Sequence, residues 1–396
     1  MKISKRHLLN YSILIPYLLL SILGLIVVYS TTSAILIEEG KSALQLVRNQ
    51  GIFWIVSLIL IALIYKLRLD FLRNERLIIL VILIEMLLLF LARFIGISVN
   101  GAYGWISVAG VTIQPAEYLK IIIIWYLAHR FSKQQEEIAT YDFQVLTQNQ
   151  WLPRAFNDWR FVLLVLIGSL GIFPDLGNAT ILVLVSLSPI LSLVSAVSVF
   201  VLTTISLIGV ETFSKIPVFG YVAKRFSAFF NPFADRADAG HQLANSYFAM
   251  VNGGWFGLGL GNSIEKRGYL PEAHTDFVFS IVIEEFGFVG ASLILALLFF
   301  MILRIILVGI RAENPFNAMV ALGVGGMMLV QVFVNIGGIS GLIPSTGVTF
   351  PFLSQGGNSL LVLSVAVAFV LNIDASEKRA KLYRELENQP MNLLLK

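Results

Sequence analysis

The sequence predicts an all-α, polytopic integral membrane protein with about ten transmembrane helices, and two observations carry this prediction. Hydrophobic residues make up 57% of the 396 residues and charged residues only 13%, with a mean hydropathy of +0.83. A water-soluble domain could not bury that much apolar surface in one core. The apolar residues also fall into runs long enough to cross about 30 Å of hydrocarbon as helices.

The first predicted span, residues 11–30, follows Lys2, Lys5 and Arg6. A cleaved signal peptide is the rival interpretation, but its apolar region is usually shorter and ends at a cleaner cleavage site. A run from 179 to 209 is too long for one ordinary span, and Pro189 with its neighbouring serines predicts a tight hairpin there. The other predicted spans cover residues 51–65, 77–92, 115–131, 161–173, 178–191, 193–210, 276–303, 316–336 and 357–373. Without repeats or a soluble domain, residues 1–396 form one membrane domain.

The distribution of cations predicts that both termini lie in the cytoplasm. With this orientation the inner segments carry Lys66, Arg68, Arg73, Arg76, Arg130, Lys133, Arg154, Arg160, Arg304, Arg311 and the basic residues of the tail, residues 374–396. Residues 376–387 of the tail are predicted to form a short charged helix at the membrane surface. Outside lies one long loop between the seventh and eighth spans, residues 211–275, with the cations Lys215, Lys224, Arg225, Arg236, Lys266 and Arg267. These cations indicate either an anionic partner or a solvated loop face.

Several classes of function are excluded by what the sequence lacks. There is no cysteine, so disulfides, thiol nucleophiles and thiolate metal sites are absent. The four histidines have no ligand spacing, and no Walker loop, dinucleotide fingerprint or nucleophile elbow occurs. No basic array suggests nucleic acid as a partner. The membrane itself is the partner that the composition requires.

Polar residues that could carry chemistry gather in four clusters on the predicted outer side. In residues 100–120, NGAYGWISVAGVTIQPAEYLK, glycines permit a re-entrant or folded loop, and Pro115 suits the first turn of a helix. Glu117 and Lys120 then share one helical face. A structural ion pair and an organiser of a substrate site remain equally open for them.

Two further clusters have few or no charges. In residues 174–178, PDLGN, Asp175 is best explained as a helix cap. Residues 341–359, GLIPSTGVTFPFLSQGGNS, combine glycine, proline and hydroxyl groups and include Ser354. Such backbone is tolerated at membrane depth only where protein covers it or where it lines a wet cavity. This segment is therefore predicted to shape a site.

The fourth cluster holds Glu272, His274 and Asp276, where a charged loop enters an apolar helix. Burial and neighbouring charges can tune the pKa of a carboxylate at such a boundary. Ser280 and Glu284 follow at four-residue steps and predict a polar stripe that enters the membrane from Asp276. A helix cap and a catalytic acid or base both remain open for Asp276. For Glu284 and Glu285, ion pairs inside the bundle are the simpler interpretation.

At these clusters the sequence resembles the SEDS family of polytopic cell-wall proteins. The motifs that carry the resemblance are NGGWFGLGLGNSIEKRGYLPEAHTDF, QPAEYLK, PDLG and IPSTGVTFPFLSQGGNS, and it extends over nearly the whole chain. The glycine-rich motif and YLPEAHTDF are most similar to the division branch, FtsW, and the compact outline to streptococcal-type members. Family members often carry a basic residue just before the tryptophan of the first cluster, whereas this chain has Tyr103 and Gly104 before Trp105.

The resemblance implies a peptidoglycan glycosyltransferase that polymerises lipid II on the outer face of the cytoplasmic membrane at the division septum. It assigns the essential aspartate to Asp276, the loop tryptophan to Trp105 and the paired acid and lysine to Glu117 and Lys120. A class B penicillin-binding protein and other septal division proteins are the implied partners.

The chemistry of glycosyl transfer suits these residues. An acceptor hydroxyl attacks poorly without a base, and Asp276 can supply one. The implied change from an α-linked donor to a β-linked product needs a single inverting displacement. Lys120, Lys266 or Arg267, with a divalent cation such as Mg²⁺ or Mn²⁺ of unknown ligands, could stabilise the departing pyrophosphate. His274 and Ser354 complete the predicted substrate-binding residues, and no nucleotide or organic cofactor is expected.

Two other classes of function remain as alternatives. A lipid II flippase or transporter would also use many spans and buried acids such as Glu85, and a non-catalytic division scaffold would use the charged tail and loops. A transporter should place polar groups along both halves of the bilayer, whereas this chain concentrates them on the predicted outer side. The polymerase is therefore preferred, with the long outer loop expected to act as a mobile cover and as the docking surface for the class B partner.

Overall fold

The structure of the protein is a computed structural model, which describes residues 8–99, 102–108, 111–133, 166, 178, 181–182, 220–233 and 240–387. Within these residues six helices are long and apolar enough to cross a membrane. The spans predicted at 161–173, 178–191 and 193–210, together with Asp175 and Lys215, lie almost entirely outside the described residues. The count of ten spans therefore stays a prediction.

The six candidate spans are α1 (Tyr11–Glu38), α2 (Gln45–Lys66), α3 (Glu75–Ile95), α12 (Val278–Arg311), α13 (Pro315–Ile339) and α14 (Gly357–Glu387). The remaining elements are a 3₁₀ helix, η2 (Leu69–Arg73), the helices α4 (Pro115–Lys133), α10 (Gly220–Phe230) and α11 (His241–Gly253), and the strands β1 (Ile97–Val99), β2 (Ala102–Val108) and β3 (Val111–Ile113). The predicted tail helix at 376–387 is not separate but continues α14.

The all-α prediction is wrong in one place, because residues 97–113 form a three-stranded antiparallel sheet in the order β1-β2-β3. Ile97 pairs with Trp105, and Ile106 pairs with Ile113. Aromatic and β-branched residues dominate this segment, and they pack well on a pleated surface. The predicted folded loop is thus a small sheet that joins α3 to α4.

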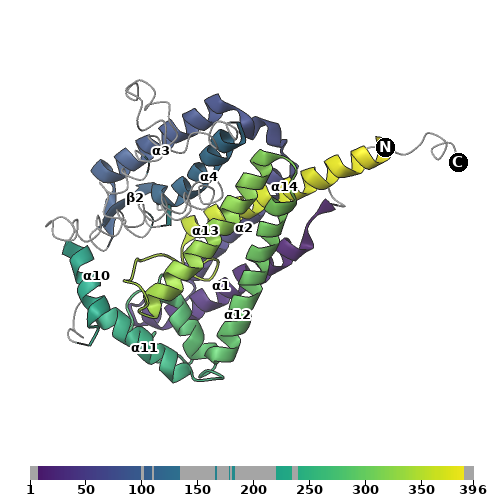
Figure 1. Cartoon of the computed structure of the whole chain (residues 1–396). Helices are drawn as coiled ribbons and strands as arrows, with labels where there is room; N and C mark the ends of the chain where they lie inside the picture. The colour runs from purple at the N-terminus through teal and green to yellow at the C-terminus, as the bar shows by residue number, and fades with distance from the viewer. Residues whose placement is uncertain are drawn as a thin grey trace.

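The start of α1 and the C-terminal part of α14 lie at the same end of the helix bundle (Figure 1), which we call the terminal end. There the Asn10 side chain donates a hydrogen bond of 3.1 Å to Asp374, which closes α1 onto α14. Near the start of α13, the Asn317 amide donates a 2.6 Å hydrogen bond to Glu377 of α14. α13 therefore begins at the terminal end and finishes, at Ile339, at the opposite end, which we call the distal end.

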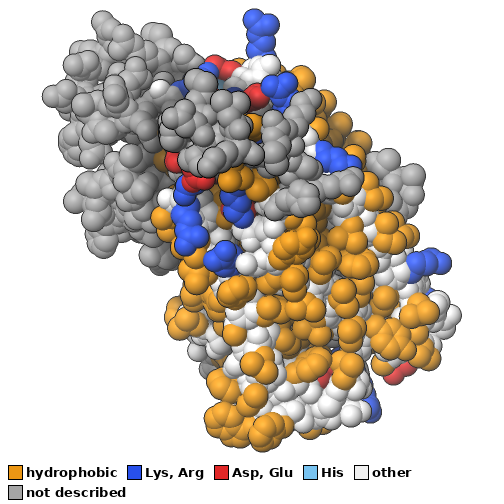
Figure 2. Space-filling model, turned by 90° about the vertical axis from the view of Figure 1, so that its right-hand side faces the viewer, with side chains coloured by type: hydrophobic (Ala, Val, Ile, Leu, Met, Phe, Trp, Pro, Cys, Tyr) orange, Lys and Arg blue, Asp and Glu red, His pale blue; other side chains and the backbone are white. Residues whose placement is uncertain are grey.

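Apolar side chains form both the core and much of the outer surface. One buried cluster joins α1, α12, α13 and α14, with Tyr17, Met327 and Leu371 among its members. By contrast, α2 and α3 expose Ile52, Ile59 and Leu83 on their outward faces. Figure 2 shows a broad continuous area of apolar side chains on one side of the molecule. An exterior of this kind suits hydrocarbon rather than water.

The chain reverses direction inside α12, at Gly287, whose φ of 71° and ψ of 178° are not helical. Before this point α12 runs toward the distal end. Asn335 of α13 donates to the carbonyl oxygen of Asp276, whereas Ser280 is joined through Ser246 to the carbonyl oxygen of Ile339, one turn further along α13. After it, α12 runs back, since Phe299 contacts Phe333 and Gly309 lies against Leu322.

This reversal corrects two predictions. Residues 276–286 are not the start of the membrane crossing predicted at 276–303, but the second arm of a re-entrant segment that dips into the bundle and returns. The polar stripe from Asp276 through Ser280 to Glu284 therefore leads outward to the distal end, not deeper into the membrane. Glycine at 287 permits the turn because it has no Cβ to oppose a positive φ.

Candidate active site

Asp276 lies beside Asn335, about 6 Å or one helical turn of α13 nearer to the terminal end than Ser280, which is joined through Ser246 to Ile339. Its carboxylate accepts a 2.9 Å hydrogen bond from the hydroxyl of Thr275, and that hydroxyl also lies 2.7 Å from a carboxylate oxygen of Glu272. One hydroxyl proton cannot serve both carboxylates at once. The Thr275 hydroxyl therefore lies between the two carboxylates and can donate to only one of them at a time.

The pKa of Asp276 reflects its burial and the charges around it. Burial raises the pKa of the Asp276 carboxyl to about 6, while the positive charge of Arg225 opposes the rise and the negative charge of Glu272 adds to it. A carboxylate with a pKa near 6 is mostly ionised at neutral pH and is a stronger base than an ordinary aspartate. Such tuning is common at functional sites.

The segment 341–359 builds one wall of this site by gripping the backbone of residues 274–276. Ser354 donates its hydroxyl to the carbonyl oxygen of Thr275 at 2.6 Å, and the Gln355 N–H donates to the carbonyl oxygen of His274 at 2.7 Å. Asn335 donates to both Asp276 and Val348, each at 2.7 Å. The uncharged segment thus fixes the backbone around Asp276, and its role in shaping a substrate site stays a prediction.

Backbone strain is concentrated in the same place. In the described part of the chain, the only non-glycine residues with positive φ are Glu272, at 57°, and Phe352, at 65°. One precedes Asp276 by four residues, and the other lies in the segment that grips it. Strained conformations of this kind persist where surrounding contacts hold them, and they gather at active sites.

Arg225 brings a cation to this site from α10. Its guanidinium donates a 3.1 Å hydrogen bond to the carbonyl oxygen of Ser345 and lies against Gly347, where a Cβ would meet it. The sequence identified Arg225 as one of six loop cations but did not single it out. Of Arg225, Lys266 and Arg267, whose side chains the structure describes, Arg225 is the one whose charge acts on Asp276.

Two of the predicted substrate-binding residues, Ser354 and His274, lie at this site. Ser354 holds the backbone in place, and His274 is uncharged. The Ser354 hydroxyl donates to Thr275 and also accepts a 2.7 Å hydrogen bond from the Phe350 N–H, so it holds backbone in place. His274 is largely covered, and burial lowers the pKa of its imidazole, although the negative charge of Glu272 opposes this shift. The lowered pKa keeps the imidazole neutral at pH 7. A neutral imidazole can donate or accept a hydrogen bond but brings no charge to a pyrophosphate.

The Glu117–Lys120 pair forms as predicted, with 2.8 Å between the Lys120 ammonium and one Glu117 oxygen. Both side chains are buried, and the second Glu117 oxygen has no hydrogen-bond partner among the described residues. Tyr118, the residue after Glu117, links this pair to the segment 341–359. Its hydroxyl donates a 3.1 Å hydrogen bond to Asn358, and the Asn358 amide donates a 2.8 Å hydrogen bond to the Thr112 carbonyl oxygen.

Trp105, partly buried in β2, belongs to the same sheet that leads into α4. The clusters at 100–120, 341–359 and 272–276 therefore join through Asn358 and Ser354. Of the cluster at 174–178, only Asn178 is described.

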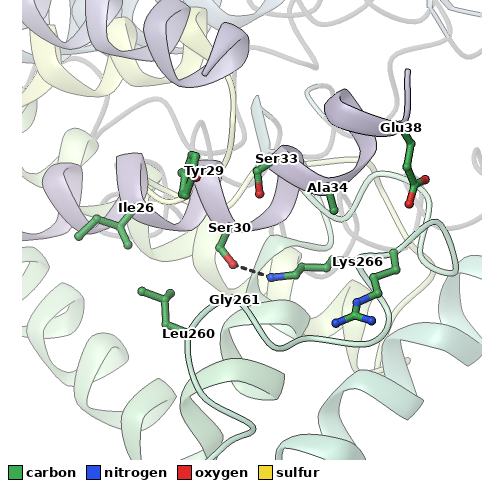
Figure 3. Close-up of a pocket in the computed structure, with 10 residues that line it drawn as sticks. Ile26, Tyr29, Ser30, Ser33, Ala34, Glu38, Leu260, Gly261 and Lys266 are labelled. Atoms are coloured by element: carbon green, nitrogen blue, oxygen red, sulfur yellow. Dashed lines mark hydrogen bonds between the residues drawn. The ribbon is translucent and has the colours of Figure 1, made fainter. Parts of the chain in front are cut away.

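Lys266 and Arg267 lie elsewhere. They line a cavity of about 480 Å³ between α1 and the loop that follows α11 (Figure 3), and none of residues 272–276 or 341–359 lines it. Lys266 is only 4% exposed, and its ammonium lies 2.6 Å from a Glu285 oxygen and 2.8 Å from the Ser30 hydroxyl. Lys266 is thus neutralised inside the bundle, as the ion-pair interpretation of Glu285 expected.

Glu284 holds the rest of this loop. Its fully buried carboxylate accepts hydrogen bonds from the Asn252 amide at 3.2 Å, from the Ser263 hydroxyl and from the Ile264 N–H at 3.1 Å. From the sequence we predicted that this loop is a mobile cover. In the structure, the buried carboxylates of Glu284 and Glu285 bind residues 252–266 and hold them against α12. The signal that could have indicated this is an adjacent pair of acids in an apolar helix, which need buried partners.

Among the described residues, no three histidine, aspartate or glutamate side chains meet as a ready-made metal site. Glu272 and Asp276 are two carboxylates around one hydroxyl. A Mg²⁺ or Mn²⁺ ion that keeps several waters and takes further oxygens from a substrate phosphate needs no more than that from the protein.

The fold and the site define a polytopic helical membrane protein with a strained, carboxylate-bearing re-entrant segment. The chain belongs to the FtsW/RodA/SpoVE family of cell cycle proteins, whose family model matches residues 10–379. It is 47% identical to a Lactococcus lactis protein named "Probable peptidoglycan glycosyltransferase FtsW", over 98% of this chain and 97% of that one. It is 36% identical to the protein of the same name from Enterococcus hirae, over 95% of each chain.

A solved structure supports the fold independently. The structure described as "Structural coordination of polymerization and crosslinking by a peptidoglycan synthase complex" aligns with a TM-score of 0.70 at 22% identity, over 93% of this chain and 98% of that chain. At this identity the similarity establishes the fold and not the chemistry.

Proposed function

We infer that the chain is a peptidoglycan glycosyltransferase of the FtsW type, which polymerises lipid II into glycan strands with Asp276 as the general base. Its relatives carry that name over nearly their full length. The observation that supports the role of Asp276 is a carboxylate with a pKa raised to about 6, at the tip of a strained re-entrant segment beside Arg225.

In the proposed reaction an acceptor hydroxyl gives its proton to Asp276 as its oxygen attacks the anomeric carbon of the donor. The new glycosidic C–O bond forms while the bond from that carbon to the lipid pyrophosphate breaks, with inversion at carbon. Arg225 faces the carboxylate and offers positive charge to the departing pyrophosphate. A divalent ion held by Glu272 and Asp276 would add electrostatic stabilisation of the same kind.

Lys120 stabilises Glu117 in this proposal, and the pair lines the site from the α4 side. Trp105 and His274 are proposed to contact the uncharged part of the substrate. Arg267 is proposed to contact substrate at the separate cavity against α1, where a lipid-linked substrate could approach along the apolar residues Ile26 and Leu260, and the buried Lys266 is proposed to hold the loop that lines this cavity.

The proposed orientation places the distal end outside the cell and both termini in the cytoplasm. The terminal end carries Arg68, Arg73, Arg311 and Arg384, which favours the cytoplasmic side. Lipid II polymerisation would then occur in the outer leaflet at the division septum, at the depth of Asp276.

A class B penicillin-binding protein is the proposed principal partner, with other septal division proteins beside it. The related solved structure is described as a complex that coordinates polymerisation with crosslinking. At the distal end of this chain, Trp255 and Phe256 are 68% and 83% exposed on the loop after α11. Large exposed aromatic side chains are typical anchors of a protein interface.

The deciding experiment gives the purified full chain lipid II in detergent, with and without a class B partner, and measures glycan strands by gel electrophoresis. Strand formation without a membrane to cross identifies a polymerase. Transport of a labelled lipid II in vesicles with no polymerisation under any condition would instead identify the flippase. Neither activity, with intact partner binding, would identify a scaffold.

A further inference from the structure

A second cavity lies at the terminal end, across the molecule from Asp276, and takes no part in the proposed reaction. Its volume is about 540 Å³. Three segments surround it: η2 with the residue before it, the turn between α12 and α13, and the C-terminal part of α14. The side chains on which its chemistry depends are Arg68, Asp70, Arg73, Glu313, Glu377, Arg379 and Arg384.

Each of the three carboxylates in this cavity already has a partner. Asp70 lies 3.7 Å from Arg68, and Glu313 lies 2.5 Å from Arg384. Glu377 accepts hydrogen bonds from the Glu313 N–H at 3.1 Å and from the Asn317 amide at 2.6 Å. Two guanidinium groups then remain, those of Arg73 and Arg379.

Neither Arg73 nor Arg379 has a carboxylate within ion-pair distance among the described residues. Arg73 is held over the ring of Phe316, with 5.7 Å from its guanidinium carbon to the ring centroid. The Nε of Arg379 is buried and has no hydrogen-bond partner in the described part of the chain. The cavity lining therefore holds four guanidinium groups against three carboxylates, and in the described part of the chain Arg73 and Arg379 are the two that no carboxylate pairs with.

Guanidinium groups recognise phosphate through paired N–H donors, and stacking on an aromatic ring fixes their orientation before a ligand arrives. The backbone N–H groups before α13 are not the binding group here, because the Glu377 carboxylate already accepts a hydrogen bond from the Glu313 N–H. A ligand must therefore be held by the side chains of Arg73 and Arg379.

The surroundings indicate where such a phosphate would come from. The cavity lies where the candidate spans α2 and α12 end and α13 begins, and the ends of membrane spans lie near the lipid headgroups. Leu67, Phe71 and Ile310 expose their apolar side chains beside it. Basic pockets at the ends of membrane spans with apolar flanks are suited to anionic phospholipids.

We propose that this terminal-end cavity binds a phosphate-bearing anion through Arg73 and Arg379, and that its source is the headgroup of an anionic phospholipid in the adjoining leaflet. The bound lipid joins η2, the α12–α13 turn and α14 at one point. Binding of this anion does not depend on the proposed glycosyltransferase activity.

The test uses the full chain in phosphatidylcholine nanodiscs with or without phosphatidylglycerol, and native mass spectrometry counts the phosphatidylglycerol that stays bound. The double variant Arg73→Gln/Arg379→Gln should retain about tenfold less, because two charge-assisted contacts are lost. Glu377→Gln should retain more, since it removes a negative charge from the cavity. Lys381→Gln removes an exposed cation of the same helix outside the cavity and should match the unaltered chain.

A further arm adds inorganic phosphate to the protein in detergent and follows thermal unfolding. Protection by phosphate that the double variant abolishes, without selective lipid retention, would assign the cavity to a soluble phosphate compound. Equal retention by the double variant and the unaltered chain, with no effect of phosphate, overturns the proposal. If the double variant does not fold, the two single variants and Glu377→Gln make the same comparison.

Discussion

Asp276 differs from an ordinary aspartate because the protein partly buries it and because the charges of Glu272 and Arg225 act on it. These neighbours act in opposite directions on its pKa, while burial dominates. The result is a base whose ionisation falls within the physiological range. Residues that carry out proton transfer are commonly tuned in this way.

Replacement of Asp276 by asparagine should lower lipid II polymerisation by roughly 10²- to 10⁴-fold, since the amide keeps the shape and loses the base. Strand synthesis by the purified variant, with thermal unfolding as a control for folding, checks this. Near-normal turnover by a well-folded Asp276→Asn protein would rule out the assignment.

The pH dependence of polymerisation should show an acidic limb near pH 6. Asp276 acts as a base only when ionised, so activity falls as the pH drops below its pKa of about 6 and levels off above it. Glu272→Gln removes the neighbouring negative charge, lowers the pKa and moves the limb to lower pH. Arg225→Gln removes the cation and moves it to higher pH. A profile that neither variant shifts would assign the limb to another group.

At the scale of elements, the re-entrant segment depends on a few buried contacts rather than on helix propensity. Glu284 and Glu285 fasten the loop after α11 to α12, while Ser354 and Asn335 fasten the tip. Removing one partner of a buried ion pair leaves an uncompensated charge, whereas removing both does not.

Lys266→Met should therefore destabilise the protein by about 3–5 kcal/mol, and Lys266→Met with Glu285→Gln should recover much of the loss. Thermal unfolding in detergent of the two single variants and the double variant measures this coupling. Additive losses would mean that the pair has little mutual energy in the folded protein.

Gly287→Ala should prevent correct folding of the re-entrant segment. The residue has φ of 71°, and an added Cβ would meet the backbone of Phe256 and Gly257. Gly261→Ala is the matched control: its φ is 85°, but nothing lies within 4 Å of its Cβ, so strain of about 1 kcal/mol is the whole cost. Expression level and unfolding temperature distinguish the two, and equal behaviour would contradict a close packed turn at Gly287.

For the same reason Gly257 cannot serve as a simple probe of loop motion, because its Cβ would collide with the Glu285 backbone. Hydrogen exchange across residues 252–266 would report whether the clamped loop opens when a class B partner is added.

At the scale of the whole molecule, the site is assembled from segments that are far apart in the sequence. Asn358 of α14 holds both Tyr118 of α4 and Thr112 of β3, and this places the Glu117–Lys120 pair beside the segment that grips Asp276. Activity should therefore depend on the pair even though it does not touch Asp276 directly.

Glu117→Gln and Lys120→Met should each lower activity more than stability, and the double change should cost less than the sum, because the buried pair acts as a unit. Initial rates and unfolding temperatures of the four proteins measure both quantities. Unfolding in either single variant would favour a structural bridge.

How far the sequence alone reaches can be seen in particular residues. The apolar runs located seven helices that the structure describes, the six candidate spans and α4, because a long run without charges has few alternatives in a bilayer. The run predicted at 115–131 forms the helix α4, which is not among the six candidate spans. Glu117 and Lys120 were paired correctly, since their three-residue spacing fixes a common helical face. Asp276 stands out in the sequence because its carboxylate lies next to an apolar helix. Carboxylates within an apolar helix need buried partners, and this indicated ion pairs for Glu284 and Glu285.

Other features could be decided only by the tertiary structure. The direction of residues 278–286 depends on one glycine conformation and on which carbonyl oxygens Asn335 and Ser246 reach, and neither is encoded in hydropathy. Whether Arg225, Lys266 or Arg267 faces Asp276 depends on how three distant segments pack, because side-chain charge specifies attraction but not position. The sequence by itself determined the membrane class, the family resemblance and the residues able to react; the packing of α10, α13 and residues 341–359 decided which of them meet.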